Sequence, residues 1–288
     1  MSKNRIQAIL KTILSLILIS YLVFIFDFKQ LKLLKINSIG VLIFSVCITL
    51  GALFIMSLRW KIIISTLDIY ADIKYLYVTY IKASFYNVFF PGAIGGDIIR
   101  TKNITKQYSL SLKKATIVTV TERLCGLYML FVIGSIGLLS FNPPAYFLQT
   151  INFSYLKFLL FFIILLIPLL KFFLNKKIQL DYRTIFPILL LSLLGQLGDI
   201  TIAWLFCYNL GVDISFTQLL TIMPVVYFVT VLPISLGGIG VREGVFVALL
   251  SMYSINNSIA ILISFLMYFV KVLTGIVGWV FILIEKNE

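Results

Sequence analysis

Long apolar runs, repeated along the whole chain, are the feature that most limits how this sequence can fold. A helix needs about 20 apolar residues to cross a bilayer. Six runs of about this length lie at residues 7–26, 38–57, 115–140, 153–174, 185–210 and 258–284. Of the 288 residues, 61% are hydrophobic and only 12% are charged, whereas soluble domains carry about a quarter charged residues. The sequence therefore predicts an all-α, polytopic transmembrane helical bundle, with residues 1–288 forming a single integral membrane domain.

Two further apolar segments, 75–100 and 216–253, are each interrupted in the middle by Pro and clustered Gly. Proline removes a backbone donor and ends a helix, and glycine adopts backbone conformations that other residues avoid. Such breaks at membrane depth are tolerated only where protein or a water-filled cavity satisfies the freed backbone groups. We therefore expect six full spans plus two broken, re-entrant helical segments.

The distribution of charge predicts the orientation of the chain. There are 24 Lys and Arg against 11 Asp and Glu, a net charge of +13. No nucleic-acid partner is expected, because the cations are spread through short loops instead of forming one basic face. Cytoplasmic loops of membrane proteins carry such an excess. Counting loops on alternate sides predicts a cytoplasmic amino terminus, with Arg59 among the cytoplasmic loop cations and Trp60 at the inner interface.

A short motif occurs once in each half of the chain. PGAIGGDIIR, residues 91–100, and PISLGGIGVR, residues 233–242, share the frame P-x-x-[IL]-G-G-x-x-[IV]-R. By the count of spans, the first copy is approached from the cytoplasm and the second from outside, which predicts an inverted repeat of halves at about 1–140 and 153–288. Paired Gly/Pro-interrupted segments of this kind are the best sequence pointer to a transporter's central binding site.

The residue types in the motif favour an anionic ligand. A half-helix that begins after the glycines would point unpaired N–H groups and a positive dipole end into the cavity, and an Arg one turn later can hold phosphate through two hydrogen bonds. The alternative is a pair of surface turns between ordinary helices. The residues concerned are Pro91 and Pro233 at the breaks, the glycines Gly95, Gly96, Gly237, Gly238 and Gly240, and the cations Arg100 and Arg242.

Several ionisable residues lie within the apolar segments. A charge left unpaired in hydrocarbon costs several kcal/mol, so each should face the bundle interior and a partner. An alternative role is a set of buried ion pairs that only fix helix register. The residues are Asp97, Glu122, Arg123, Asp199, Glu243 and Lys271.

The chain contains no His, and its three cysteines, Cys47, Cys125 and Cys207, stand alone in apolar runs. The usual general base and the usual zinc ligands are therefore missing. We expect no metal ion, no cofactor and no structural disulfide.

Three stretches together resemble one known family. NVFFPGAIGGDIIR (residues 87–100), TERL (121–124) and PISLGGIGVRE (233–243) are similar to the flippase-like integral membrane family, also called the lysylphosphatidylglycerol synthase transmembrane region. The resemblance implies a helical bundle in the cytoplasmic membrane of a bacterium or archaeon that handles an anionic or polyprenyl-phosphate-type lipid. Some members are fused to a soluble aminoacyltransferase domain. Because this chain ends at Glu288, we expect it to lack the synthase activity.

The leading hypothesis is a lipid flippase or carrier-lipid transporter whose partners are the bilayer and a membrane lipid, with a homo-oligomer or a lipid-modifying enzyme as further partners. An alternative is a membrane-embedded enzyme or accessory subunit in phospholipid or lipid-linked glycan synthesis. An ion channel ranks last, because opposite charges lie close together. The residues expected to bind the headgroup anion are Arg100, Arg123, Arg242, Gly95, Gly96, Gly237, Gly238, Gly240 and Asn87. The residues expected to form a gating or counter-charge network are Asp97, Glu122, Glu243, Asp199 and Lys271.

Overall fold

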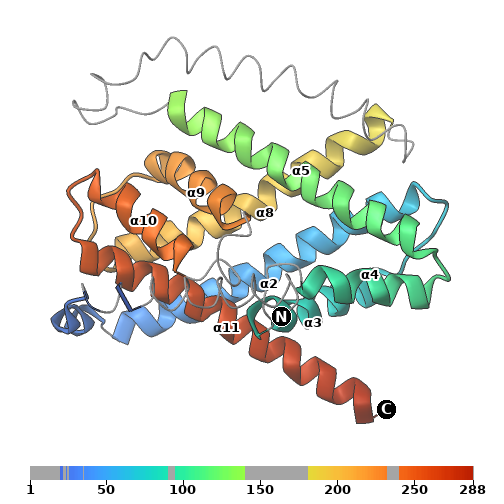
Figure 1. Ribbon diagram of the computed structural model, residues 1–288, viewed down its shortest axis with the longest axis horizontal. Coiled ribbons are helices and arrows are strands. Elements are labelled where there is room, and N and C mark those ends of the chain that lie inside the picture. Colours follow the sequence, from blue (N-terminus) through green and yellow to red (C-terminus); the bar gives the residue numbers. More distant parts are fainter. Residues whose placement is uncertain are drawn as a thin grey trace, which may run out of the picture.

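The computed structural model describes residues 20, 21, 24, 26–34, 36–89, 95–139, 181–231 and 240–287. Every regular element in those ranges is a helix (Figure 1), which confirms the predicted all-α class. The expected span at 153–174 and most of that at 7–26 lie outside the described residues. So do the expected helix breaks and two of the glycines: Pro91, Pro233, Gly237 and Gly238.

Four long helices account for four of the six predicted spans. By length and apolar composition each can cross a membrane. They are α2 (Ile36–Ser65), α5 (Leu112–Leu139), α8 (Tyr182–Asn209) and α11 (Asn257–Asn287).

The end of α2 differs from the prediction. The helix continues to Ser65, past the expected end at residue 57, and it carries Arg59 into the protein interior, where that side chain is 4% exposed. The assignment of Arg59 to a cytoplasmic loop is therefore wrong. The physical reason is that the guanidinium is paired with a buried carboxylate, so a cation does not have to end the span.

Each predicted broken segment consists of two shorter helices. The first comprises α3 (Ile73–Phe89) and α4 (Gly95–Gln107), and the second comprises α9 (Phe216–Val231) and α10 (Val241–Ser251). In both pairs the two helices pack against each other. We call α3–α4 the first hairpin and α9–α10 the second hairpin. A short 3-10 helix, η1 (Phe28–Leu33), precedes α2.

The two hairpins lie at opposite ends of the long helices (Figure 1). At one end the backbone N–H of Asp72, just before α3, donates to the hydroxyl of Tyr108, just after α4, at 3.1 Å. Both ends of the first hairpin therefore meet beside the end of α2 and the start of α5. At the opposite end the Ser38 hydroxyl at the start of α2 donates to Asn209 at the end of α8, at 2.7 Å.

Contacts between helices cross from one half of the chain to the other. The central pair is α2 and α8, one from each half. The first hairpin packs through α3 against α11, and the second hairpin packs through α9 against α5. Each hairpin is thus held by the last long helix of the other half.

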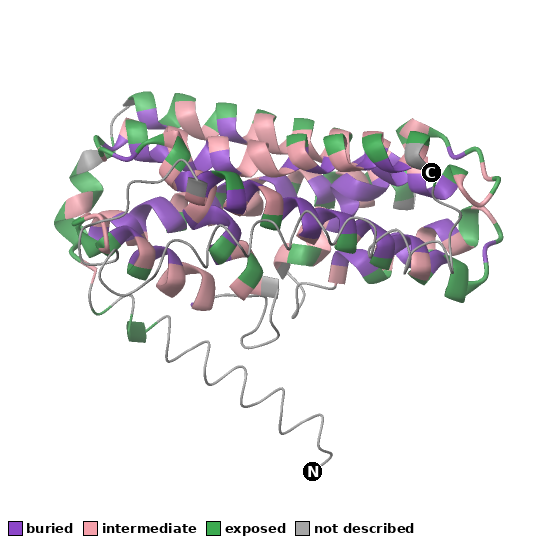
Figure 2. Cartoon of the chain, turned by 90° about the horizontal axis from the view of Figure 1, so that it is seen from above, coloured by how far each residue is buried: buried purple, intermediate pink, exposed green. Residues whose placement is uncertain are grey.

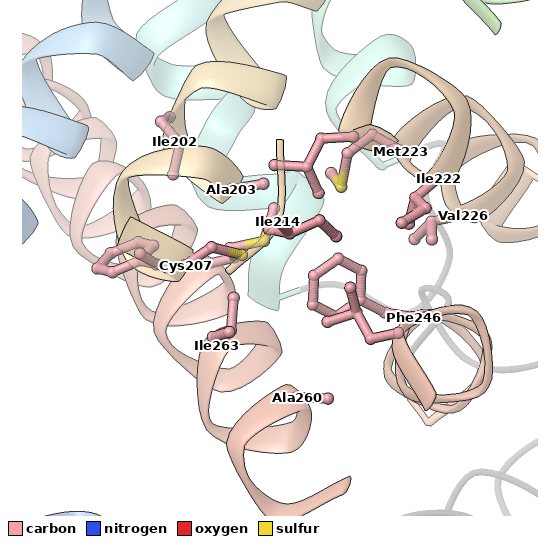
Figure 3. Close-up of a cluster of buried hydrophobic side chains, with 14 of the residues drawn as sticks. Ile202, Ala203, Cys207, Ile214, Ile222, Met223, Val226, Phe246, Ala260 and Ile263 are labelled. Carbon is pink, nitrogen blue, oxygen red and sulfur yellow. The ribbon is translucent and has the colours of Figure 1, made fainter. Parts of the chain in front are cut away.

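Buried residues lie along the middle of the bundle and exposed residues on the outward helix faces (Figure 2). The buried hydrophobic side chains form two main clusters. One cluster joins α2, α3, α4 and α5 around Trp60. The other joins α8 to α11 around Phe206 and Phe246, and Figure 3 shows part of it, with Cys207 and Ile263 near Phe246. Large apolar side chains such as Phe186 and Phe265 are exposed on the outside, as expected of helices that face lipid.

Candidate functional site

Glu122 of α5 is the centre of a buried charge network beside the first hairpin. The residue is 1% exposed. Its carboxylate accepts hydrogen bonds from Arg59 of α2 at 2.7 Å, from Arg100 of α4 at 2.8 Å, and from the hydroxyl of Tyr80 of α3. A buried carboxylate is stable only when it is paired and hydrogen-bonded. Glu122 therefore links four helices through its own carboxylate.

The Arg100 guanidinium is engaged on every side by protein groups. One nitrogen donates to Glu122, and the other donates to Asp97 at 2.5 Å. Its central carbon lies 4.2 Å from the centroid of the Tyr80 ring and 5.1 Å from that of Trp60. Cation–π contacts of this kind are strongest in desolvated sites. Arg100 is therefore a rigid, shielded charge in this conformation.

Arg123, next to Glu122 on α5, is the most accessible cation of the group. Its Nε pairs with the second carboxylate oxygen of Asp97, and 39% of the side chain is exposed. The network holds three guanidiniums, those of Arg59, Arg100 and Arg123, against the two carboxylates of Asp97 and Glu122. It thus carries one positive charge in excess, and the accessible part of that charge lies at Arg123.

A pocket of about 300 Å³ opens onto this network. That volume is at the lower end of the range for small-ligand sites, about 300–1,000 Å³. Part of its wall is polar and part is apolar. The polar lining comes from Arg59, Tyr80, Ser84, Asn87, Asp97, Arg100, Glu122, Arg123 and Gln196, and the apolar lining from Leu53, Met56, Ala83, Leu127 and Leu130. The chemistry of the wall suits an amphiphile with an anionic head.

The glycines of the first motif copy have a packing role at the start of α4. A Cβ on Gly96 would lie 2.6 Å from the backbone oxygen of Ala83 and 2.5 Å from Oδ1 of Asn87, closer than such atoms approach. The N–H of Gly96 donates to that same Asn87 oxygen at 2.9 Å. Gly96 therefore brings α4 close to α3, and the backbone that it approaches is that of the protein.

A second charged group lies at the second hairpin. Arg242 pairs with Glu243 on α10, and the guanidinium lies 5.0 Å from the centroid of the Tyr268 ring. Glu243 also accepts the N–H of Gly240 at 2.7 Å. Gly240 has φ of 83°, a left-handed conformation that favours glycine. This confirms the expected positive φ at that position.

Lys271 of α11 and Asp199 of α8 belong to the same region. The Lys271 ammonium lies 5.1 Å from the centroid of the Tyr227 ring of α9. Tyr227, Arg242 and Lys271 border a cavity of only about 10 Å³. The predicted site residues that the structure describes thus form two groups, one beside each hairpin.

The sequence pattern does not identify four members of the first group. Its prediction places Arg59 in a loop and Trp60 at the inner interface, but Trp60 is fully buried. It does not single out Tyr80, or Ser192 of α8, which accepts a hydrogen bond from Arg59 at 2.9 Å. The one available signal was the apolar run Ile62–Ile64 after Arg59, which indicates that the helix continues.

Among the described residues, no group of three or more His, Cys, Asp or Glu side chains is placed so that it could hold a metal ion. Glu122 and Asp97 are instead neutralised by guanidiniums.

Comparison with known proteins agrees with this picture of a multi-pass membrane protein. The sequence profile described as the lysylphosphatidylglycerol synthase TM region matches residues 9–278. No curated protein gives a match to the chain. The profile covers the described helices almost completely, and it relates the protein to membrane lipid metabolism. The chain belongs to the family of lysylphosphatidylglycerol synthase transmembrane regions.

Proposed function

We propose that the protein is a lipid flippase that moves an anionic phospholipid or a polyprenyl-phosphate-type lipid across the cytoplasmic membrane. The observation that carries the proposal is the pocket beside the first hairpin, because it combines an excess of guanidinium charge with an apolar wall. A soluble anion would make no favourable contact with the apolar part of the wall. A lipid would contact both parts, with its phosphate on the cations and its chains along Leu53, Leu127 and Leu130.

Arg123 is the first contact of the headgroup in this proposal. It is the most exposed of the three guanidiniums, and its partner Asp97 also binds Arg100. A phosphate that displaces Asp97 from Arg123 would therefore loosen the contact between α4 and α5. Guanidinium and phosphate form strong paired hydrogen bonds, so headgroup binding would act directly on the position of the first hairpin.

The packing of the hairpins supports an inverted repeat. A Cβ on Gly137 of α5 would meet Thr221 of α9 at 2.6 Å, and one on Gly278 of α11 would meet the backbone of Ile81 of α3. These two glycines are 141 residues apart, and the two copies of the Pro/Gly/Arg motif are 142 residues apart. Each glycine lets the last long helix of one half approach the hairpin of the other half closely, with the hairpins at opposite ends, as an inverted repeat would require.

Lipid translocation in proteoliposomes tests the proposal. We expect Arg123→Gln to reduce translocation of fluorescent phosphatidylglycerol by about ten- to a hundredfold, because a lost charge-assisted contact costs about 1.5–3 kcal/mol. The matched control is Lys113→Gln, which removes an exposed cation from the same helix outside the pocket. Unchanged translocation in Arg123→Gln, or in the double variant Arg100→Ala with Arg242→Ala, would sink the proposal.

The same assay separates transport from enzymatic modification. A transporter leaves the covalent structure of the lipid unchanged, whereas a membrane-embedded enzyme alters it. Mass spectrometry of the recovered lipid should therefore return only the starting species. Lipids that co-purify with the protein should be rich in phosphate headgroups.

Thiol labelling tests the orientation that the proposal requires. Lys106 near the end of α4 and Asp213 before α9 are both exposed. In a background with the exposed Cys47 replaced by Ser, Lys106→Cys should react with a membrane-impermeant reagent only from the cytoplasm, and Asp213→Cys only from outside. Labelling of both from one side would contradict the inverted repeat.

A further inference from the structure

The two halves of the protein contribute corresponding sets of three side chains with opposite charges. In the first set, α2 supplies Arg59, α3 supplies Tyr80 and α5 supplies Glu122. In the second set, α8 supplies Asp199, α9 supplies Tyr227 and α11 supplies Lys271. In the first half the central helix, α2, carries the cation and the last long helix, α5, carries the anion. In the second half the central helix, α8, carries the anion and the last long helix, α11, carries the cation. We call Asp199, Tyr227 and Lys271 the second trio.

The second trio is less tightly paired than the first. Neither Asp199 nor Lys271 has an ion-pair partner within 4.0 Å among the residues that the structure describes. The hydroxyl of Tyr227 meets no partner there at full hydrogen-bond geometry, and the Asp199 carboxylate acts on it from α8. Lys271 instead rests on the Tyr227 ring. The second trio thus places Tyr227 next to a cation and an anion that form no ion pair with each other.

The identity of the cation sets what the trio can do. An Arg stays protonated in proteins, so the first set has a fixed charge, whereas a buried Lys can release its proton. A direct ion pair would hold both Lys271 and Asp199 in their charged forms, because moving a proton between them would give up that ion pair. Without that bond, a partly buried Lys near a carboxylate and a tyrosine hydroxyl can exchange a proton at a smaller cost.

The surroundings of Lys271 connect this exchange to the second hairpin. The charged groups that act on it are Asp199 of α8 and the pair Arg242 and Glu243 of α10. Tyr227 of α9 lies beneath it, and Tyr268, nearly one turn earlier on α11, lies beneath Arg242. From α2 and α3, which also pack against α11, no described charged group acts on Lys271.

An anion at Arg242 would change the proton affinity of Lys271. Arg242 and Lys271 border the same small cavity, so a positive charge on one disfavours a positive charge on the other, and a phosphate would neutralise the charge of Arg242. Arrival of an anionic lipid at the second hairpin would therefore strengthen proton binding at Lys271, and release of a proton would weaken lipid binding, because linkage between two sites is reciprocal. This step rests on the proposed lipid transport.

We infer that Asp199, Tyr227 and Lys271 form a proton-exchange site that couples movement of the anionic lipid to the difference in pH across the membrane. The two sets then have different roles. The Arg-based network beside the first hairpin holds a permanent charge for the headgroup. The Lys-based trio beside the second hairpin gains and loses a proton during the transport cycle.

The test uses the full chain in phosphatidylcholine vesicles that contain fluorescent phosphatidylglycerol. Translocation is measured without a pH difference and with a difference of about one unit, imposed in each direction in turn and then dissipated with a protonophore. One proton per cycle allows the ratio of the two rates to reach about tenfold, since one pH unit is a tenfold change in proton activity. The ratio should invert when the difference is reversed and return to one with the protonophore.

Two variants locate the effect. Lys271→Arg keeps the positive charge but cannot release a proton, and Asp199→Asn removes the acid, so both should show a ratio near one. The matched control is Lys82→Arg, which alters the buried lysine that pairs with Glu285 at 2.5 Å, and it should keep the wild-type ratio. Monodisperse elution in detergent checks that each variant is folded.

The outcomes separate this inference from the proposed function. Wild-type translocation that does not respond to pH overturns the proton coupling and leaves lipid transport standing, as does a wild-type ratio in Lys271→Arg. Absence of any wild-type translocation overturns both. In weakly buffered detergent solution, adding phosphatidylglycerol should cause proton uptake by the wild type and none by Lys271→Arg, and equal uptake by the two would also overturn the coupling.

Discussion

The two hairpins carry copies of one motif, yet their charges are held in different ways. Beside the first hairpin, Glu122 accepts three hydrogen bonds, and Arg100 is enclosed by Trp60 and Tyr80. Beside the second, Arg242 pairs with its neighbour Glu243, and Lys271 rests on an aromatic ring. The repeated motif therefore places a cation at each hairpin. The residues on neighbouring helices determine whether the charges beside it are held by several direct bonds or by few.

The largest expected effect comes from breaking the first network. Glu122→Gln leaves the buried guanidiniums of Arg59 and Arg100 with only Asp97 for compensation, and loss of one partner of a buried pair costs about 3–5 kcal/mol. The matched control is Asp213→Asn, because Asp213 is exposed and surface substitutions usually change stability by no more than about 0.5 kcal/mol. Unfolding in detergent, followed by circular dichroism, measures both. Equal losses would refute the contrast between locked and exposed charges.

A smaller loss of stability is expected when the close contacts between helices of the two halves are disrupted. Gly137→Ala and Gly278→Ala each force a methyl group into a contact that has no space for it, and overpacking costs about 1–3 kcal/mol. Gly51→Ala is the control, because nothing lies within 4 Å of its added Cβ, and alanine favours helix by up to about 1 kcal/mol. Comparable melting temperatures for the three variants would argue against equivalent packing in the two halves.

Removing the charge of Lys271 in the second trio should instead stabilise the folded protein. Lys271→Met removes a charge that has no ion pair among the described residues and keeps an unbranched side chain over Tyr227. Replacing buried charges by apolar groups is often neutral or stabilising by about 1–4 kcal/mol, and we expect a gain of about 1 kcal/mol in the free energy of unfolding. The same detergent unfolding assay measures it. A loss as large as that of Glu122→Gln would mean that the second trio is also locked.

The smallest expected loss of stability comes from removing one hydrogen bond at the start of α4. Asn87→Ala removes the acceptor of the Gly96 N–H, and one hydrogen bond contributes about 0.5–1.5 kcal/mol. Asn103→Ala on α4 is the control, because its described hydrogen bond, from Tyr75, goes to the backbone oxygen. Hydrogen exchange of the α4 amides measures both. Equal exchange rates would remove Asn87 from the hairpin's support.

Most of the fold follows from local properties of the sequence. The lengths of the apolar runs predicted the four long helices, although α2 continues past its expected end, and each interrupted segment contains two shorter helices. Part of the site followed too: Asp97 and Arg100 are three residues apart on one helix, and they do form an ion pair. The role of Arg59 did not follow, because a cation at the end of an apolar run is equally compatible with a loop and with a buried ion pair.

By itself, the sequence determined that this chain is a helical membrane protein with two interrupted segments, because apolar length and helix breakers act through neighbouring residues. Only the tertiary structure decided that Arg59, Tyr80, Arg100 and Glu122 meet, and that the second trio is not directly paired. Those contacts join residues that are 22 to 63 positions apart in the sequence, and the cost of a buried charge depends on partners that no local pattern identifies.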